Sequence, residues 1–204
     1  MIRNHILMDA VTVAPKYIPL IQKPKCCAVA CLQMLLYRNG FGLFDQEDLA
    51  VEFGVKIGID DKSAFREDMP LMTDFNFDEG ISTIESVDRI NTFFKKSNIS
   101  LFATPHSFSS IKSLRDLIVE NLAQNNDIWI EYHTHHVHAG DINNKRIHDA
   151  LIESFDAKTD SVVIIDPKPG RRQRLTVPLE SIQQALSSEF GKELGLLIIE
   201  KKTA

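Results

Sequence analysis

Three cysteines, one histidine and one aspartate are the residues of this sequence whose types and spacing could perform chemistry. All 3 cysteines of the 204-residue chain lie within one short stretch, at Cys26, Cys27 and Cys31. An odd number of thiols packed this closely excludes a disulfide framework that joins distant segments. A thiol in the first turn of a helix is favoured as the thiolate, because the helix dipole and the free N–H groups stabilise an anion. The cluster therefore predicts a reactive cysteine with a lowered pKa, which needs an imidazole to exchange its proton.

His148 and Asp166 are the candidates for this imidazole and for the group that orients it. His148 directly precedes one strand-like stretch, and Asp166 ends the next. In adjacent antiparallel strands the start of one lies near the end of the other, so the two side chains can meet. Asp149 and Asp156 are alternative orienting acids. Asp149 follows His148 directly, and its side chain would point to the opposite face of a strand, so Asp166 is preferred.

The elements expected to position these residues are helices in the first part of the chain and mainly strands in the second. Helices are predicted at about 26–39, 45–53, 82–96, 110–124 and 179–188. Strands are predicted at about 99–103, 128–132, 150–155, 161–165, 174–177 and 194–200. The helix that follows the cysteines is apolar over most of its girth, so it is expected to be central and buried. Residues 55–81 show no clean period and are expected to form an acidic surface loop. Helices followed by strands predict an α+β fold.

Composition limits the class of protein further. The chain is 44% hydrophobic and 25% charged, which is typical of one globular domain spanning residues 1–204. Its net charge of -5 argues against a nucleic-acid partner. No apolar run approaches the ~18 residues that a membrane span requires. The first residues contain no hydrophobic segment of the length found in secretory signals, so a cytoplasmic location is expected. The oligomeric state is left open.

The residues around the candidate site resemble those of the papain-like C39 and C39-like cysteine peptidases. The resemblance is carried by Gln22, by the run Cys26-Cys-Ala-Val-Ala-Cys-Leu-Gln-Met34, by His148, and by Asp166-Pro167. In that family a glutamine precedes an Asp-Cys-Gly-x-Ala-x-Leu-x-Met helix start, and a histidine-led strand is followed by a strand ending in Asp-Pro. This chain has Ala28 for the glycine and Cys26 for the aspartate, and its glutamine lies one residue closer to the cysteine than in transporter-linked members.

The resemblance implies a papain-like fold, with a mainly helical lobe over about 20–125 and a mainly β lobe over about 126–204. It makes Cys27 the nucleophile, because the alanine, leucine and methionine of the motif then fall three, five and seven residues later. His148 corresponds to the general base, Asp166 to its orienting group, and Gln22 to the oxyanion-hole side chain that acts with the Cys27 N–H. It implies a free-standing cysteine peptidase that cleaves a peptide or protein substrate through a thioester and needs no cofactor.

Several alternatives remain at this stage. Cys26 is a rival nucleophile, although choosing it shifts the motif out of register, and Cys31 is expected to pack in the core. An acyltransferase or transpeptidase would use the same thiol, and a non-catalytic peptide-binding module is another possibility. A dense histidine cluster could bind a metal; its members are His133, His135, His136 and His138. The paired cysteine spacing of structural zinc sites is absent, so a polar loop is preferred there.

Overall fold

The computed structural model describes residues 9–72, 82–138, 146–187 and 195–202. Its helices are α1 (Cys27–Arg38), α2 (Gln46–Phe53), α3 (Val87–Lys96), α4 (Ile111–Ala123) and α5 (Leu179–Leu186), with 3-10 turns η1 (Ile59–Ala64) and η2 (Thr134–His136). Its strands are β1 (Ala10–Thr12), β2 (Leu101–His106), β3 (Asp127–His133), β4 (Ile147–Asp156), β5 (Ser161–Ile165), β6 (Arg174–Pro178) and β7 (Leu196–Lys201). The predicted α+β class is confirmed.

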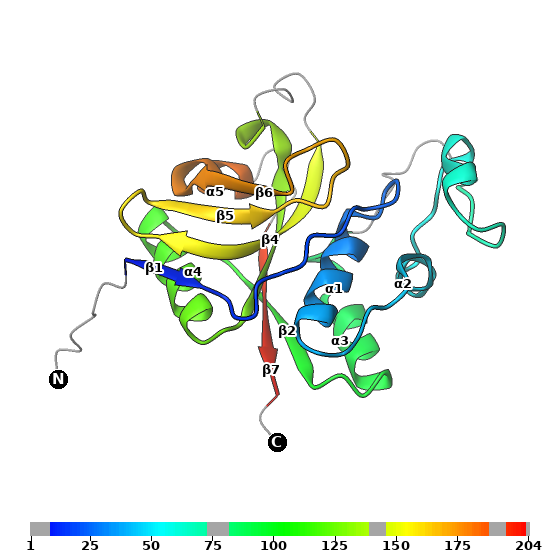
Figure 1. Ribbon diagram of the computed structural model, residues 1–204, viewed down its shortest axis with the longest axis horizontal. Coiled ribbons are helices and arrows are strands. Elements are labelled where there is room, and N and C mark those ends of the chain that lie inside the picture. Colours follow the sequence, from blue (N-terminus) through cyan, green and yellow to red (C-terminus); the bar gives the residue numbers. More distant parts are fainter. Residues whose placement is uncertain (1–8, 73–81, 139–145, 188–194, 203–204) are drawn as a thin grey trace.

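The strands form one antiparallel sheet that carries helices on both sides. Its order is β2-β7-β3-β4-β5-β6, and β1 pairs with β4. In Figure 1, α1, α2 and α3 lie to one side of the strands, and α1 contacts β4 while α3 contacts β2. Helices α4 and α5 contact each other and β3. The late strand β7 therefore lies between two strands of the earlier chain.

Helix α1 is the buried apolar helix that the sequence predicts, but it begins without a side-chain cap. Cys26 is its N-cap residue and makes no capping hydrogen bond, whereas Asp45 caps α2 by accepting from the N–H groups of Glu47 and Asp48. Gly54 ends α2 with a φ of 72°, a left-handed conformation that glycine adopts without strain. Most of α1 is buried, as expected for the central helix.

A buried polar cluster pins the far end of α1 to the sheet. The Nη1 of Arg38 lies 2.6 Å from Oδ1 of Asp127 at the start of β3, and Asn39 donates to the other carboxylate oxygen at 2.6 Å. The hydroxyl of Tyr17 also donates to Asp127. Paired and fully hydrogen-bonded charges of this kind are costly to break singly, typically by about 3–5 kcal/mol. The cluster fixes the direction of α1, and with it the position of the cysteines at its other end.

Three features of the fold differ from the sequence expectations. Strand β1 was not expected, and it pairs with β4 through Val11 and Phe155. Strand β4 begins at Ile147, so His148 lies inside a strand that was expected to start later. Helix α3 begins at Val87, later than the predicted start at about residue 82, although the Ser82 hydroxyl still accepts from the Glu85 N–H at 3.4 Å. The ends of two predicted elements, at residues 188 and 194, and part of the acidic stretch, 73–81, lie outside the described residues. None of the helices in the described ranges combines the length and apolar character needed to cross a bilayer.

Candidate active site

Cys27 differs from its two neighbouring cysteines in exposure. Cys26 and Cys31 are fully buried members of the core, whereas Cys27 is partly exposed at the first position of α1. The packing of Cys31 in the core agrees with its position on the apolar face of the helix. Of the three cysteines, Cys27 is therefore the one with part of its surface open to solvent.

The thiol of Cys27 makes its hydrogen bond to Asp149. Its Sγ lies 3.2 Å from Oδ2 of Asp149, a carboxylate that is only 1% exposed. The other oxygen of Asp149 accepts from the hydroxyl of Thr83 and, at 2.9 Å, from the indole Nε1 of Trp129. Asp149 lies directly opposite Glu131 in the β3–β4 register, so it shares a sheet face with Trp129 and with α1. Asp149 is therefore a buried carboxylate in direct contact with the Cys27 thiol.

The predicted lowering of the Cys27 pKa is wrong. Burial raises the pKa of this thiol well above its ordinary value, and the charge of Asp149 raises it further. A helix N-terminus offers about half a positive charge, and the carboxylate in contact with the thiol opposes it. Burial also raises the pKa of Asp149 itself. Burial also raises the pKa of Cys26, to about 12, and that of Cys31. In the resting arrangement all three cysteines are thiols.

His148 and Asp166 meet, as the antiparallel strands suggest. The Nε2 of His148 lies 2.7 Å from Oδ1 of Asp166, which is fully buried at the end of β5. The second oxygen of Asp166 lies 3.2 Å from Nε2 of His138, and the Lys168 N–H donates to Oδ1 at 2.8 Å. Burial alone would raise the pKa of Asp166, but the hydrogen bonds from His138 and His148 outweigh it, so the pKa lies below its ordinary value. Asp166 is thus a stable anion that anchors His148.

This contact sets the tautomer of His148. Because Nε2 donates its proton to a carboxylate, Nδ1 of the neutral ring is left as the acceptor. The ring packs edge-on against Tyr132, with centroids 5.8 Å apart. Within the described residues no hydrogen bond joins Cys27 to His148. The Cys27–Asp149 pair and the His148–Asp166 pair are linked through β4, because His148 and Asp149 are consecutive residues of that strand.

Gln22 lies beside the Asp-Pro segment. Its backbone N–H donates to the carbonyl of Pro167 at 2.9 Å, which places it next to Asp166. Its side-chain Oε1 is buried and has no hydrogen-bond partner among the described residues. A buried amide oxygen without a partner can accept a hydrogen bond from a ligand. The four residues expected at the site are therefore distributed over three contacts: Cys27 with Asp149, His148 with Asp166, and Gln22 with Pro167.

Two residues near the site have partners that the sequence does not predict. Asp149 was considered only as an orienting acid for His148, and the structure instead brings it to Cys27. His138 was one member of the histidine cluster, and its ring also lies 3.1 Å from the hydroxyl of Tyr132. The four histidines are therefore not equivalent. Over the ranges that the structure describes, no three His, Cys, Asp or Glu side chains are grouped as a metal site requires.

Glu131 adds a second buried acid beside Asp149. It is 4% exposed, and its Oε2 accepts a hydrogen bond from the hydroxyl of Ser82 at 3.2 Å. Burial, reinforced by the charge of Asp149, raises the Glu131 pKa from 4.5 to about 8. Between pH 4.5 and about pH 8, the folded chain thus holds a proton on Glu131 that the unfolded chain releases. Its contribution to stability is complete below about pH 4.5 and is lost as the pH rises toward 8.

We expect Glu131→Gln to remove this pH dependence. The variant carries a neutral group at the same place, so its free energy of unfolding should exceed that of the wild type at pH 8 by more than at pH 5. The expected difference is on the order of a few kcal/mol. Urea unfolding at both pH values measures it, and Glu180→Gln on the surface of α5 is the control. An equal change at both pH values would show that Glu131 is ionised in the folded chain.

Comparison with known proteins identifies the fold. No family model matches the sequence, and no curated protein is similar to it. Among solved structures, the chain resembles a candidate C39-like peptidase from Bacillus anthracis, with a TM-score of 0.61, 18% identity, and coverage of 97% of this chain and 100% of that one. It also resembles a double-glycine motif protease of an AMS/PCAT transporter, solved with a leader peptide, with a TM-score of 0.51, 14% identity, and coverage of 95% and 99%. The chain therefore has the fold of the C39-like, papain-like peptidases.

Proposed function

We propose that this chain is a cysteine peptidase that cleaves peptide bonds with Cys27 as nucleophile, His148 as general base and Asp166 as its orienting group. The proposal rests chiefly on the 2.7 Å contact between His148 and the fully buried Asp166. His148 precedes Asp149, which accepts the hydrogen bond of the Cys27 thiol. The fold shared with C39-like peptidases supports it. Gln22 completes the site as a donor to the carbonyl oxygen of the substrate.

In this proposal the Cys27 thiol leaves Asp149 when substrate binds and gives its proton to Nδ1 of His148. Sγ attacks the carbonyl carbon of the scissile bond while His148 takes the thiol proton, and the carbonyl oxygen becomes an oxyanion. The oxyanion accepts from the Cys27 N–H and the Gln22 amide. The C–N bond then breaks, the amine leaves with the proton from His148, and a thioester remains. Water, deprotonated by His148, attacks the thioester, which releases the acid and restores the thiol.

A peptide is the substrate class that we propose. One of the structurally similar proteins was solved with a leader peptide, so an extended segment bound across the start of α1 is the arrangement to test here. Attack by an amine in place of water would convert hydrolysis into transpeptidation without any change in the residues at the site. The product of the second step is therefore decided by what enters after the first amine leaves.

The test of this function is the order in which the three thiols react. With the folded protein at about pH 8, iodoacetamide should label Cys27 at least about tenfold faster than Cys26 or Cys31, because the other two thiols are fully buried. His148→Ala should slow this labelling, since it removes the proton acceptor. Mass spectrometry of the peptides locates the adduct. Equal labelling of all three thiols, or labelling confined to Cys31, would contradict the assignment.

A generic acyl donor extends the test beyond binding. Wild-type protein should release a burst of p-nitrophenol from p-nitrophenyl acetate as Cys27 is acylated, and Cys27→Ser should lose most of that burst. A non-catalytic peptide-binding module would give no burst above that of Cys27→Ser. His148→Gln, which keeps a polar side chain of similar length, is the second variant if His148→Ala proves unstable.

A further inference from the structure

We propose that Gln46, on α2, is a positioning residue that holds the oxyanion-hole glutamine Gln22 in place. The inference rests on the proposed function, because it concerns how one side chain of that site is oriented. Gln46 is 9% exposed and lies on α2, outside the residues that contact Cys27 or His148. It acts through the backbone on either side of Gln22.

The side-chain amide of Gln46 bridges the two peptide groups that flank Gln22. Its Oε1 accepts from the Lys23 N–H at 2.5 Å, and its Nε2 donates to the Ile21 carbonyl at 3.3 Å. The Gln22 N–H donates to the Pro167 carbonyl from the opposite side. These two peptide units have four polar groups, and three of them are hydrogen-bonded: the Ile21 carbonyl, the Gln22 N–H and the Lys23 N–H. A backbone fixed on both sides of Gln22 limits where its side chain can point.

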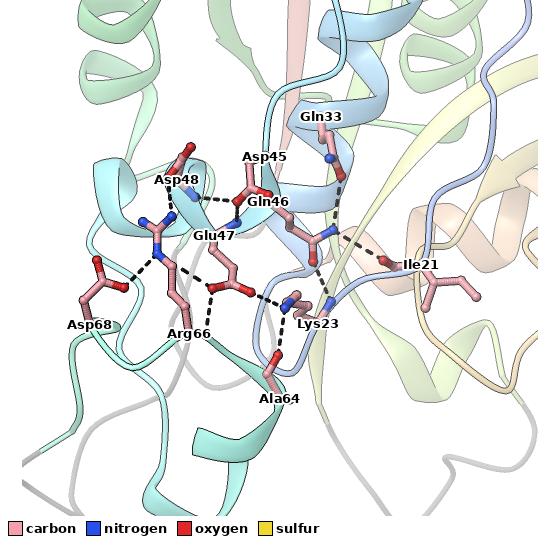
Figure 2. Close-up of polar contacts among 10 residues, drawn as sticks. All are labelled: Ile21, Lys23, Gln33, Asp45, Gln46, Glu47, Asp48, Ala64, Arg66 and Asp68. Atoms are coloured by element: carbon pink, nitrogen blue, oxygen red, sulfur yellow. Dashed lines mark hydrogen bonds and ion pairs between the residues drawn. The ribbon is translucent and has the colours of Figure 1, made fainter.

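A second glutamine determines which way the Gln46 amide faces. Gln33, on α1, donates through Nε2 to the Phe44 carbonyl at 2.5 Å, so its Oε1 is turned toward Gln46. That oxygen accepts from Gln46 Nε2 at 3.1 Å, as Figure 2 shows. With its nitrogen committed to Gln33 and Ile21, Gln46 must present its oxygen to Lys23. The chain of amides links the central helix directly to the segment that carries Gln22.

The neighbouring residue Glu47 provides a matched control on the same helix. It contacts the same residue, Lys23, but through the side-chain Nζ rather than through the peptide N–H. Glu47 also accepts from the Arg66 N–H at 2.9 Å, and this group of charges lies on the outer side of the segment in Figure 2. Removing the Glu47 charge loosens the Lys23 side chain without removing either bond that Gln46 makes to the backbone around Gln22.

The experiment compares two reactions of the same thiol. Acylation by p-nitrophenyl acetate passes through an oxyanion, whereas alkylation by iodoacetamide is a displacement at a CH₂ group and forms no oxyanion. We expect Gln22→Ala to lower the acylation rate about 100-fold and Gln46→Leu about tenfold, with alkylation of Cys27 unchanged in both. Glu47→Gln should leave the ratio of the two rates at the wild-type value.

The double variant separates positioning from a general effect on the fold. If Gln46 acts through Gln22, Gln46→Leu should cause no further loss of acylation in the Gln22→Ala background. Gln46→Glu, which keeps an acceptor for Lys23 but loses the donor to Ile21, should fall between the wild type and Gln46→Leu. Additive losses, equal loss of both reactions, or an equal effect of Glu47→Gln would overturn the inference. If Cys27→Ser loses acylation but Gln22→Ala does not, the inference about Gln46 is overturned while Cys27 remains the nucleophile. If the burst is unchanged in Cys27→Ser, the proposed function itself fails.

Discussion

Replacing Asp149 with asparagine is expected to make Cys27 react faster with iodoacetamide at neutral pH. The carboxylate contacts Sγ at 3.2 Å and, together with burial, raises the thiol pKa. Removing its charge favours the thiolate. A charge in direct contact shifts a pKa by about 1–3 units, so the rate at pH 7 should rise about 10- to 1000-fold. The pH profile of alkylation measures the shift as a displacement of its midpoint to lower pH.

Two controls accompany this variant. Glu131→Gln removes another buried acid on the same sheet face without touching the thiol, and its effect on the alkylation profile should be much smaller. Trp129 is the one tryptophan of the chain and donates to Asp149, so its fluorescence reports whether the surroundings of residue 149 are preserved. Slower alkylation in Asp149→Asn with unchanged fluorescence would mean that Asp149 takes the thiol proton and assists the reaction.

Asp166→Asn is expected to have the largest effect on acyl transfer. Asp166 holds His148 in the tautomer whose Nδ1 accepts a proton, and an asparagine can present an amide N–H that favours the other tautomer. In enzymes with a Ser-His-Asp triad the corresponding change costs about 10⁴ in kcat. We expect a loss of similar order in the p-nitrophenol burst rate, with the reaction of Cys27 with iodoacetamide reduced as well.

His138 provides the comparison that this prediction needs. Asp166 has two histidine partners, His138 and His148, and the two single variants distinguish which ring acts as the proposed base. If His148 is the base, His148→Ala should match Asp166→Asn in its loss of acylation, and His138→Ala should cost far less. The reverse order would transfer the role of base to His138 and leave His148 as a structural partner of the aspartate.

Much of the fold follows from local signals in the sequence. Asp45 and Gly54 mark the two ends of α2, and the apolar run of β5 has the predicted bounds, 161–165. These boundaries are set by capping geometry and by alternation over a few residues. The meeting of His148 and Asp166 also follows, because it needs only two adjacent antiparallel strands in the expected register. Such features depend on neighbours in sequence or on a single strand pairing.

Other features depend on contacts between distant parts of the chain. Ser82 and Glu85 have the spacing of a capping box, and the Ser82 hydroxyl does accept from the Glu85 N–H at 3.4 Å. The same hydroxyl also donates to Glu131, and that of Thr83 donates to Asp149, both on distant strands. The regular part of α3 starts only at Val87. The pKa of Cys27 also depends on tertiary structure, since it is raised first by burial and then by the charge of Asp149, a residue 122 positions away. The three-residue strand β1 carries too little local pattern to be recognised without its partner β4.

The position of β7 bears on the order in which the protein matures. β3 carries Trp129, which contacts Asp149, and Tyr132, which contacts His148. One edge of β3 pairs with β7, the last strand of the chain's described part. β7 also pairs with β2, far earlier in sequence, so the sheet has a high contact order and is expected to assemble slowly. During synthesis on a ribosome, β3 keeps an open edge until residues 196–201 have emerged. The strand that carries Trp129, a hydrogen-bond donor to Asp149, therefore gains its second neighbour only when nearly the whole described chain is present.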